Sequence, residues 1–215
     1  MANEPAPNES PAPQKFRFVG RALCLDLCNT MGGKREGIAR EKLHSYFDFL
    51  TWCEQAGLIS AAQAVALKER SEEVPKDALG VLKRVLELRE AIYRVFFGLF
   101  NGQKPRPDDL AIINAELAHT LGGMRISPNS ERDGFSWSWS AELLQLDYPL
   151  GPLAHSAASL LVSHDCCAHV RQCRADNCGW LFLDSSKNHS RCWCDMRDCG
   201  NRAKVRRHRA KRHGG

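Results

Sequence analysis

The 215-residue sequence predicts a mainly α fold, in which a helical bundle with a small β-hairpin precedes a cysteine-rich, ribbon-like module that ends in a basic helix. Apolar residues recur with a 3.6-residue period in several segments before residue 124, and period-two alternation follows them. Two Cys-x4-Cys pairs and a run of arginine and lysine occupy residues 171–215. A chain of this length builds one ordinary core with a small appended module.

Capping and stop residues delimit four helices in the bundle. Gly57 ends the first, Ser60 is a favoured N-cap for the second, and Pro75 suits the first turn of the third and longest. Pro105 and Pro107 separate the third helix from the fourth. The predicted helices span residues 40–56, 61–72, 75–101 and 108–119.

Composition and period predict the segments around these helices. Residues 1–15 are rich in proline and small polar side chains, so we expect a disordered tail. The apolar run at residues 18–27 fits a strand or a helix. Alternation at residues 124–127 and 134–139 predicts a β-hairpin. A helix over residues 150–169 then leads into the cysteine-rich module without a long linker, so the module is expected to pack against the bundle.

Positive charge is concentrated at the C-terminal end. The net charge is +5, and residues 171–215 carry +8 from 12 Lys/Arg and 4 Asp/Glu, which leaves −3 for residues 1–170. This asymmetry indicates that the C-terminal module contacts a polyanion while the remainder has another task. We place the helical domain at residues 16–169 and the module at residues 170–215.

The cysteine content favours metal binding in a reducing compartment. Residues 1–15 lack the features of a secretory signal, and no stretch reaches the roughly 18 apolar residues of a membrane span. We therefore expect a cytoplasmic protein without membrane contact, in which clustered cysteines bind metal and do not form disulfides. Five further cysteines lack ligand-pair spacing and are predicted to be core residues: Cys24, Cys28, Cys53, Cys166 and Cys167.

The two Cys-x4-Cys pairs predict one structural zinc ion in a zinc ribbon-like module. Cys173, Cys178, Cys194 and Cys199 supply four soft ligands, the number that a tetrahedral structural Zn²⁺ takes, with iron as the alternative. A module this small cannot build its own core. Metal binding, worth about 10–16 kcal/mol in small zinc modules, is therefore expected to supply its folding energy, so that metal removal unfolds it.

A short ribbon and two tryptophans are expected around the metal. The alternating residues 180–183 predict a strand that pairs with residues 171–172. Trp180 and Trp193 are predicted to pack on the metal site. If they were exposed they could stack on single-stranded bases, which would favour RNA over DNA as the partner.

The helix expected over residues 200–212 carries seven Lys/Arg and no Asp/Glu. Because this exceeds what solubility requires, we favour contact with nucleic acid over a solvated, frayed tail. Asn201 can bond a backbone carbonyl or a base edge, and Arg202 can reach a phosphate or a guanine. The candidate nucleic-acid contacts are Asn201, Arg202, Lys204, Arg206, Arg207 and Arg209.

Three polar residues stand out in apolar parts of the helical domain, namely Asp26, Asn29 and Arg89. One hypothesis is that they line a pocket for a small-molecule ligand. The favoured alternative is a buried ion pair together with capping side chains. No catalytic residue is identified, because no serine has a recognisable elbow and no carboxylate pair stands out by spacing, so an enzyme is not expected.

The surroundings of the cysteine pairs carry a family resemblance. The residues are Cys173-x4-Cys178-x-Trp180-x-Phe182-x-Asp184-x-Ser186, Arg191, Trp193-Cys194-Asp195-Met196 and Cys199-Gly200-Asn201-Arg202-Ala203-Lys204, a pattern that is similar to the CGNR zinc finger family. Members usually carry an N-terminal helical ABATE-type domain that contains a Leu-Asp-Phe-Val-Asn-Thr motif. The segment Leu25-Asp26-Leu27-Cys28-Asn29-Thr30 of this chain resembles that motif. The resemblance implies a bacterial, stress-induced transcription regulator whose N-terminal domain senses a ligand or partner. We favour DNA as the partner of the finger, with RNA as the nearest alternative.

Cys192 departs from the family pattern, which more often has a basic or polar residue there. A fifth thiol beside the metal suggests an alternative function as a redox sensor that loses zinc on oxidation. A homodimer would raise the affinity of so small a module for a duplex, but the sequence shows no heptad seam to mediate it.

Overall fold

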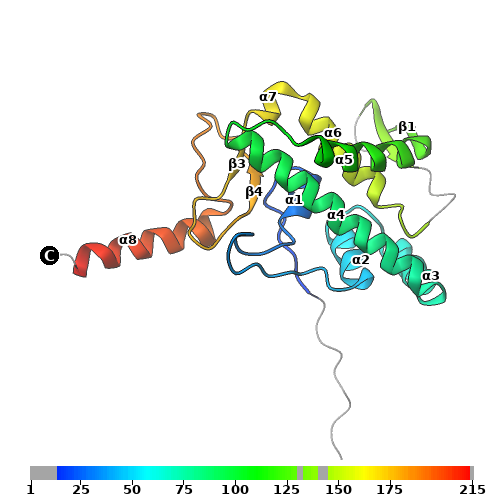
Figure 1. Cartoon of the computed structure of the whole chain (residues 1–215), viewed down its shortest axis with the longest axis horizontal. Coiled ribbons are helices and arrows are strands. Elements are labelled where there is room, and N and C mark those ends of the chain that lie inside the picture. The colour runs from blue at the N-terminus through cyan, green and yellow to red at the C-terminus, as the bar shows by residue number, and fades with distance from the viewer. Residues whose placement is uncertain (1–13, 130–132, 140–144, 214–215) are drawn as a thin grey trace, which may run out of the picture.

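The computed structural model describes residues 14–129, 133–139 and 145–213, and it confirms the mainly α fold (Figure 1). Most of the tail expected over residues 1–15 lies outside the described residues. In the part of the chain that is described, the strands form two small antiparallel sheets of two strands each. No helix there is long and apolar enough to cross a membrane.

Helix α2 (Tyr46–Gln55) begins later than the predicted helix over residues 40–56. Ser45 and Asp48 form a capping box in which the Ser45 hydroxyl accepts from the Asp48 amide and the Asp48 carboxylate accepts from the Ser45 amide. Before this cap, Arg40 and Gly32 exchange two backbone hydrogen bonds of 2.8 Å. The chain at residue 40 therefore pairs as an extended segment, and the predicted helix start is wrong.

Helices α3 (Ala61–Glu73), α4 (Pro75–Phe100) and α5 (Pro107–Thr120) lie close to their predicted bounds. Ser60 caps α3 through a capping box with Gln63. Helices α4 and α5 each begin with a proline. Proline lacks a backbone N–H, but no hydrogen bond is lost, because N–H groups in the first turn of a helix have no partner within the helix. The long α4 packs against all the other main helices of the domain.

The apolar segment that fitted either a strand or a helix is helical, and it forms α1 (Leu23–Cys28) at the centre of the molecule (Figure 1). It packs against α4, against α6 (Leu150–Val162) and against strand β4 (Leu181–Leu183). Cys24 and Cys53 are buried as predicted, and so is the last residue of α1. These contacts make α1 the shared centre of the core.

The helix predicted over residues 150–169 is interrupted after α6. Ser163 has an extended backbone, and α7 (His164–Cys167) follows it as a separate turn at the surface. Because α7 lies outside the main helix, Cys166 is exposed and its prediction as a core residue is wrong. Cys167 is half-buried at the edge of the core.

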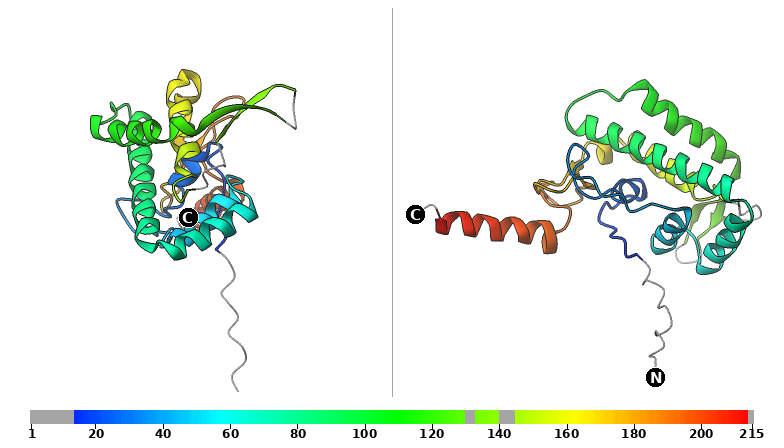
Figure 2. Two further views of the ribbon diagram at one scale, coloured as in Figure 1. Left: turned by 90° about the vertical axis from the view of Figure 1, so that its right-hand side faces the viewer. Right: turned by 60° about the horizontal axis from the view of Figure 1, so that its bottom comes forward.

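The predicted hairpin consists of β1 (Met124–Pro128) and β2 (Phe135–Trp139), which pair in antiparallel register with Met124 opposite Trp139. It follows the 3₁₀ turn η1 (Leu121–Gly123) and projects from the helices (Figure 2). This confirms the sequence prediction for the period-two segment.

The second hairpin joins the cysteine-rich module to the helical domain. Strand β3 (Val170–Gln172) pairs with β4 as predicted, and the buried side chains of Val170 and Leu181 belong to the same apolar core as the helices. The chain then forms the π-helical turn η3 (Met196–Gly200) and helix α8 (Asn201–His213). Helix α8 projects away from the body in Figure 1 and in the right-hand view of Figure 2.

Candidate metal centre and basic helix

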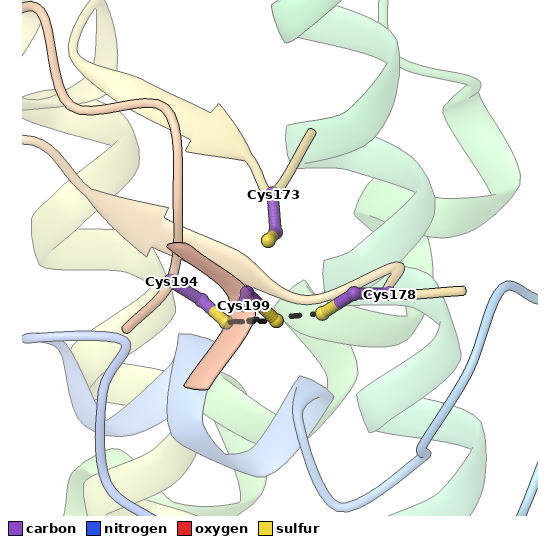
Figure 3. A group of neighbouring side chains, drawn as sticks. All are labelled: Cys173, Cys178, Cys194 and Cys199. Atoms are coloured by element: carbon purple, nitrogen blue, oxygen red, sulfur yellow. Dashed lines mark hydrogen bonds between the residues drawn. The ribbon is translucent and has the colours of Figure 1, made fainter. Parts of the chain in front are cut away.

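The four predicted cysteine ligands come together at the base of α8 (Figure 3). Cys173 follows β3, and Cys178 lies in the turn before β4, where its amide donates to the Ala175 carbonyl. Cys194 lies just before η3, and Cys199 lies within it. All four side chains are buried, and their sulfur atoms lie within 4.8 Å of one another.

The spacing of the sulfur atoms fits one structural zinc ion. The sulfurs of Cys178 and Cys194 are 3.8 Å apart, and those of Cys194 and Cys199 are 3.6 Å apart. Four thiolates about 2.3 Å from a tetrahedral zinc ion would lie about 3.8 Å from one another. Hydrogen bonds from Cys178 and Cys194 lower the pKa of Cys173, while the hydrogen bonds of Cys194 with Cys173 and Cys178 raise the pKa of Cys194. A bound zinc ion would hold all four sulfurs as thiolates.

Aromatic side chains close the metal centre. Trp180 is 8% exposed, and its indole N–H donates to the Met31 carbonyl at 3.1 Å. Phe182 is fully buried in the same cluster, and Trp193 packs against it while remaining partly exposed. The predicted packing of both tryptophans on the metal site is confirmed.

Asp184 and Arg191 order the loop between the cysteine pairs. Burial alone would raise the pKa of Asp184, but hydrogen bonds from Ser186 and from the Arg191 amide lower it. The Arg191 guanidinium donates to the carbonyls of Trp193 and Cys194. Sequence reasoning gave both residues a place in the family pattern and no physical role, because their partners are set by the loop conformation.

Two arginines hold η3 in place. Arg17 forms ion pairs with Asp195 and Asp198. Arg202 pairs with Asp198 at 3.0 Å and donates to the sulfur of Cys199 at 3.1 Å, which directs a positive charge at a metal ligand. Sequence reasoning missed Arg17, because nothing local signals partners that lie at the other end of the chain.

The predicted nucleic-acid contacts on α8 divide into two groups. Arg202 has the partners described above, and Arg206 forms an ion pair with Asp176 beside the metal centre. The other four are exposed, and their side chains make no hydrogen bond or ion pair with the described residues: Asn201, Lys204, Arg207 and Arg209.

Asp26 and Asn29, considered for a ligand pocket, have separate partners in the core. Asp26 accepts a 2.7 Å hydrogen bond from the Gly20 amide, and burial raises its pKa to about 6. The Asn29 side chain donates to the Leu181 carbonyl and accepts from the Leu181 amide, each at 2.9 Å. Asn29 thereby joins α1 of the helical domain to β4 of the module.

Arg89 forms the buried ion pair that was the alternative to a pocket. Its side chain is 3% exposed and donates to both carboxylate oxygens of Glu41 at 2.7 Å. It also donates to Glu90 at 2.8 Å and to Thr30 at 3.1 Å. Burial would lower the pKa of Arg89, but the two carboxylates raise it, so the guanidinium remains charged. Among the described residues, Arg89 shares none of its hydrogen-bond partners with Asp26 or Asn29.

The fifth thiol near the metal, Cys192, lies outside the four-sulfur cluster. It is half-buried, and its thiol donates to the Ser190 carbonyl at 3.4 Å. The group of four cysteines that could hold a metal therefore has the membership that the spacing predicts.

Together these features define a zinc-binding protein in which a helical domain is joined to a four-cysteine finger whose last ligand leads into a basic helix. Comparison with protein families identifies both parts. A family described as "Putative stress-induced transcription regulator", ABATE, matches residues 21–164, and the CGNR zinc finger matches residues 169–212. Since the first match covers more than half of the chain, the protein belongs to the ABATE family and carries a C-terminal CGNR zinc finger. Comparison with curated proteins gives no match.

Proposed function

We propose that the protein binds double-stranded DNA through α8, in a zinc-dependent manner, as part of transcription regulation. The observation that carries the proposal is that α8 projects from the body and carries three exposed cations, Lys204, Arg207 and Arg209, that no carboxylate of the described residues neutralises. The proposal is consistent with the regulator family to which the chain belongs. It adds to that family description the polymer that is bound, double-stranded DNA, and the element that binds it, α8.

The exposed sides of α8 suit a DNA groove. A helix of this length spans about 20 Å and is about 10–12 Å wide, and the major groove of B-DNA is about 12 Å wide. Arg202 and Arg206 secure the first turns of α8 to the metal centre through Asp198 and Asp176. The unpaired cations then remain available for phosphates or base edges.

The burial of Trp180 favours duplex DNA over RNA. Base stacking on single-stranded RNA requires exposed aromatic faces, and Trp180 is buried with its indole N–H bonded to Met31. Double-stranded RNA has a deep, narrow major groove that side chains cannot read. A basic helix therefore has a better site in B-form DNA.

Two contacts between the domains support a regulatory role for the helical domain. Asn29 bonds the backbone of β4, and Arg17 bonds the turn that carries Cys199. A ligand or partner that moved α1 or the segment before it would therefore disturb the base of α8. This is how the helical domain would change DNA binding.

The test is a salt titration of duplex binding by the zinc-loaded protein. The variant K204A/R207A/R209A should bind more weakly, and the slope of log K against log salt should fall by up to roughly 2.7, or about 0.9 for each phosphate that the variant no longer neutralises. K68A/K76A/K83A is the control, because it removes three exposed lysines from α3 and α4. An α8 variant that binds like this control would refute the proposal.

A further inference from the structure

The loop between α1 and α2, residues 31–40, lies against the zinc finger. The Gly179 amide donates to the Gly33 carbonyl at 3.0 Å, and the Trp180 indole donates to the Met31 carbonyl at 3.1 Å. A Cβ at Gly179 would lie 2.7 Å from the Gly33 carbonyl oxygen, so a side chain there would push the two segments apart. This segment of the helical domain is therefore fixed beside the finger.

The 31–40 loop also has a defined shape. Its two ends are joined by the paired backbone bonds between Gly32 and Arg40. Gly33 has a φ of +78°, and a Cβ there would lie 2.1 Å from the Ile38 carbonyl oxygen, so only glycine fits. The loop thus presents its side chains from a closed turn.

A cleft of about 380 Å³ lies between this loop and the base of α8. Lys34 and Arg40 line it from the loop, and Asp176 and Arg202 line it from the finger. Arg202 belongs to the first turn of α8, so the cleft is continuous with the basic helix.

The charges in the cleft leave two cations free. Asp176 is paired with Arg206, and Arg202 is engaged by Asp198 and Cys199. By contrast, Lys34 and Arg40 are exposed, and their side chains make no hydrogen bond or ion pair with the described residues. Their loop carries one other charge without a hydrogen bond or ion pair among the described residues, that of Glu36, which lines a neighbouring cavity that Lys34 also borders.

We propose that the 31–40 loop is a second nucleic-acid contact, in which Lys34 and Arg40 bind backbone phosphates of the same duplex that α8 engages. The inference rests on the proposed function and extends it to the helical domain. Two exposed cations without an ordered partner recognise phosphates through charge and do not distinguish bases. The helical domain thus holds the DNA directly as well as through the finger.

The test compares K34A/R40A with K76A/K83A, a control that removes two exposed cations from α4, with a 20-base-pair duplex as the probe. The loop variant should lower affinity roughly tenfold at about 0.15 M salt and reduce the salt slope by about 1.8, equally on two unrelated sequences. Zinc content and circular dichroism should match the wild type, since neither side chain has a partner to lose. The charge reversal K34E/R40E should weaken binding further.

The outcomes separate this inference from the proposed function. If the wild-type protein binds and K204A/R207A/R209A loses binding while K34A/R40A behaves like its control, α8 binds DNA and the loop contact is refuted. If the wild-type protein does not bind the duplex, both proposals fail. A loss in K34A/R40A that depends on base sequence would also contradict a contact to phosphates.

Discussion

The helical domain and the zinc finger are stabilised in different ways. The domain surrounds α1 with large buried side chains, among them Phe49, Trp52, Leu88 and Phe96. The second cluster, in the finger, has seven buried members, of which four are the cysteine ligands. The comparison indicates that apolar burial folds the domain and that the metal folds the region around the ligands.

The boundary between the part of the chain stabilised by apolar burial and the part stabilised by the metal does not coincide with the boundary between the two family matches. Val170 and Leu181, on the two strands of the finger hairpin, are buried in the core of the helical domain. Cys194 and Cys199 belong to the separate cluster around the metal, and the turn η3 is joined to the helical domain by the ion pairs of Arg17. We therefore expect metal loss to release the segment from residue 184 onward and to leave the β3–β4 hairpin in place, a narrower effect than unfolding of the whole module.

The largest expected effect of a substitution in the helical domain is that of Arg89→Met. It leaves Glu41, whose side chain is 25% exposed, without its bidentate partner, and breaking a buried pair in this way costs about 3–5 kcal/mol. Chemical denaturation should show this loss, and zinc content of the folded protein should be unchanged. The matched control is Arg70→Ala, which breaks an ion pair with Glu73 on the surface of α3 and should cost less than about 0.5 kcal/mol. Equal losses in the two variants would contradict the assigned role of Arg89.

Asn29→Ala acts at the seam, which is the contact between α1 of the helical domain and β4 of the finger. It leaves the amide and carbonyl of Leu181 without their partners in a buried site, which should cost about 2–4 kcal/mol. Hydrogen exchange should accelerate first at β4 and at the following finger residues. If protection fell uniformly across α4 as well, Asn29 would be part of the general core and not of the seam.

The smallest effect concerns Asp26 and its dependence on pH. Burial raises its pKa from 3.8 to about 6, so the folded state holds the proton more tightly than the unfolded state. This contribution to stability is full below pH 3.8 and is lost as pH rises to about 6. Asp26→Asn should therefore gain about 1 kcal/mol relative to the wild type between pH 5 and pH 7.5. A difference that stays constant with pH would show that Asp26 has an ordinary pKa.

The local signals in the sequence predicted much of the fold and the metal ligands. Ser60 and Pro75 mark helix starts by chemistry that acts within one turn, and the cysteine spacing defines a ligand set without reference to the rest of the chain. The start of α2 was missed because the pairing of Arg40 with Gly32 competes with helix formation there. The periodicity of apolar side chains in the sequence does not reveal such backbone pairing.

Contacts between distant segments could not be predicted. Two contacts join residues from opposite ends of the chain. They are the ion pairs of Arg17 with η3 and the hydrogen bond from the Gly179 amide to the 31–40 loop. The sequence also could not separate the cations of α8 into paired and unpaired groups, because Asp176 precedes Arg206 by most of the finger. These contacts depend on the way in which the metal centre directs the chain.

The central claim is that zinc holds the base of α8 while the helical domain stands without it. The most direct measurement is hydrogen exchange, followed residue by residue, of the zinc-loaded protein and of the same protein after chelation. We expect loss of protection from residue 184 through α8, with α1, α4 and the β3–β4 hairpin unchanged, and recovery when zinc is restored. Unaltered protection of α8 without zinc, or simultaneous loss of protection in α4, would contradict the account.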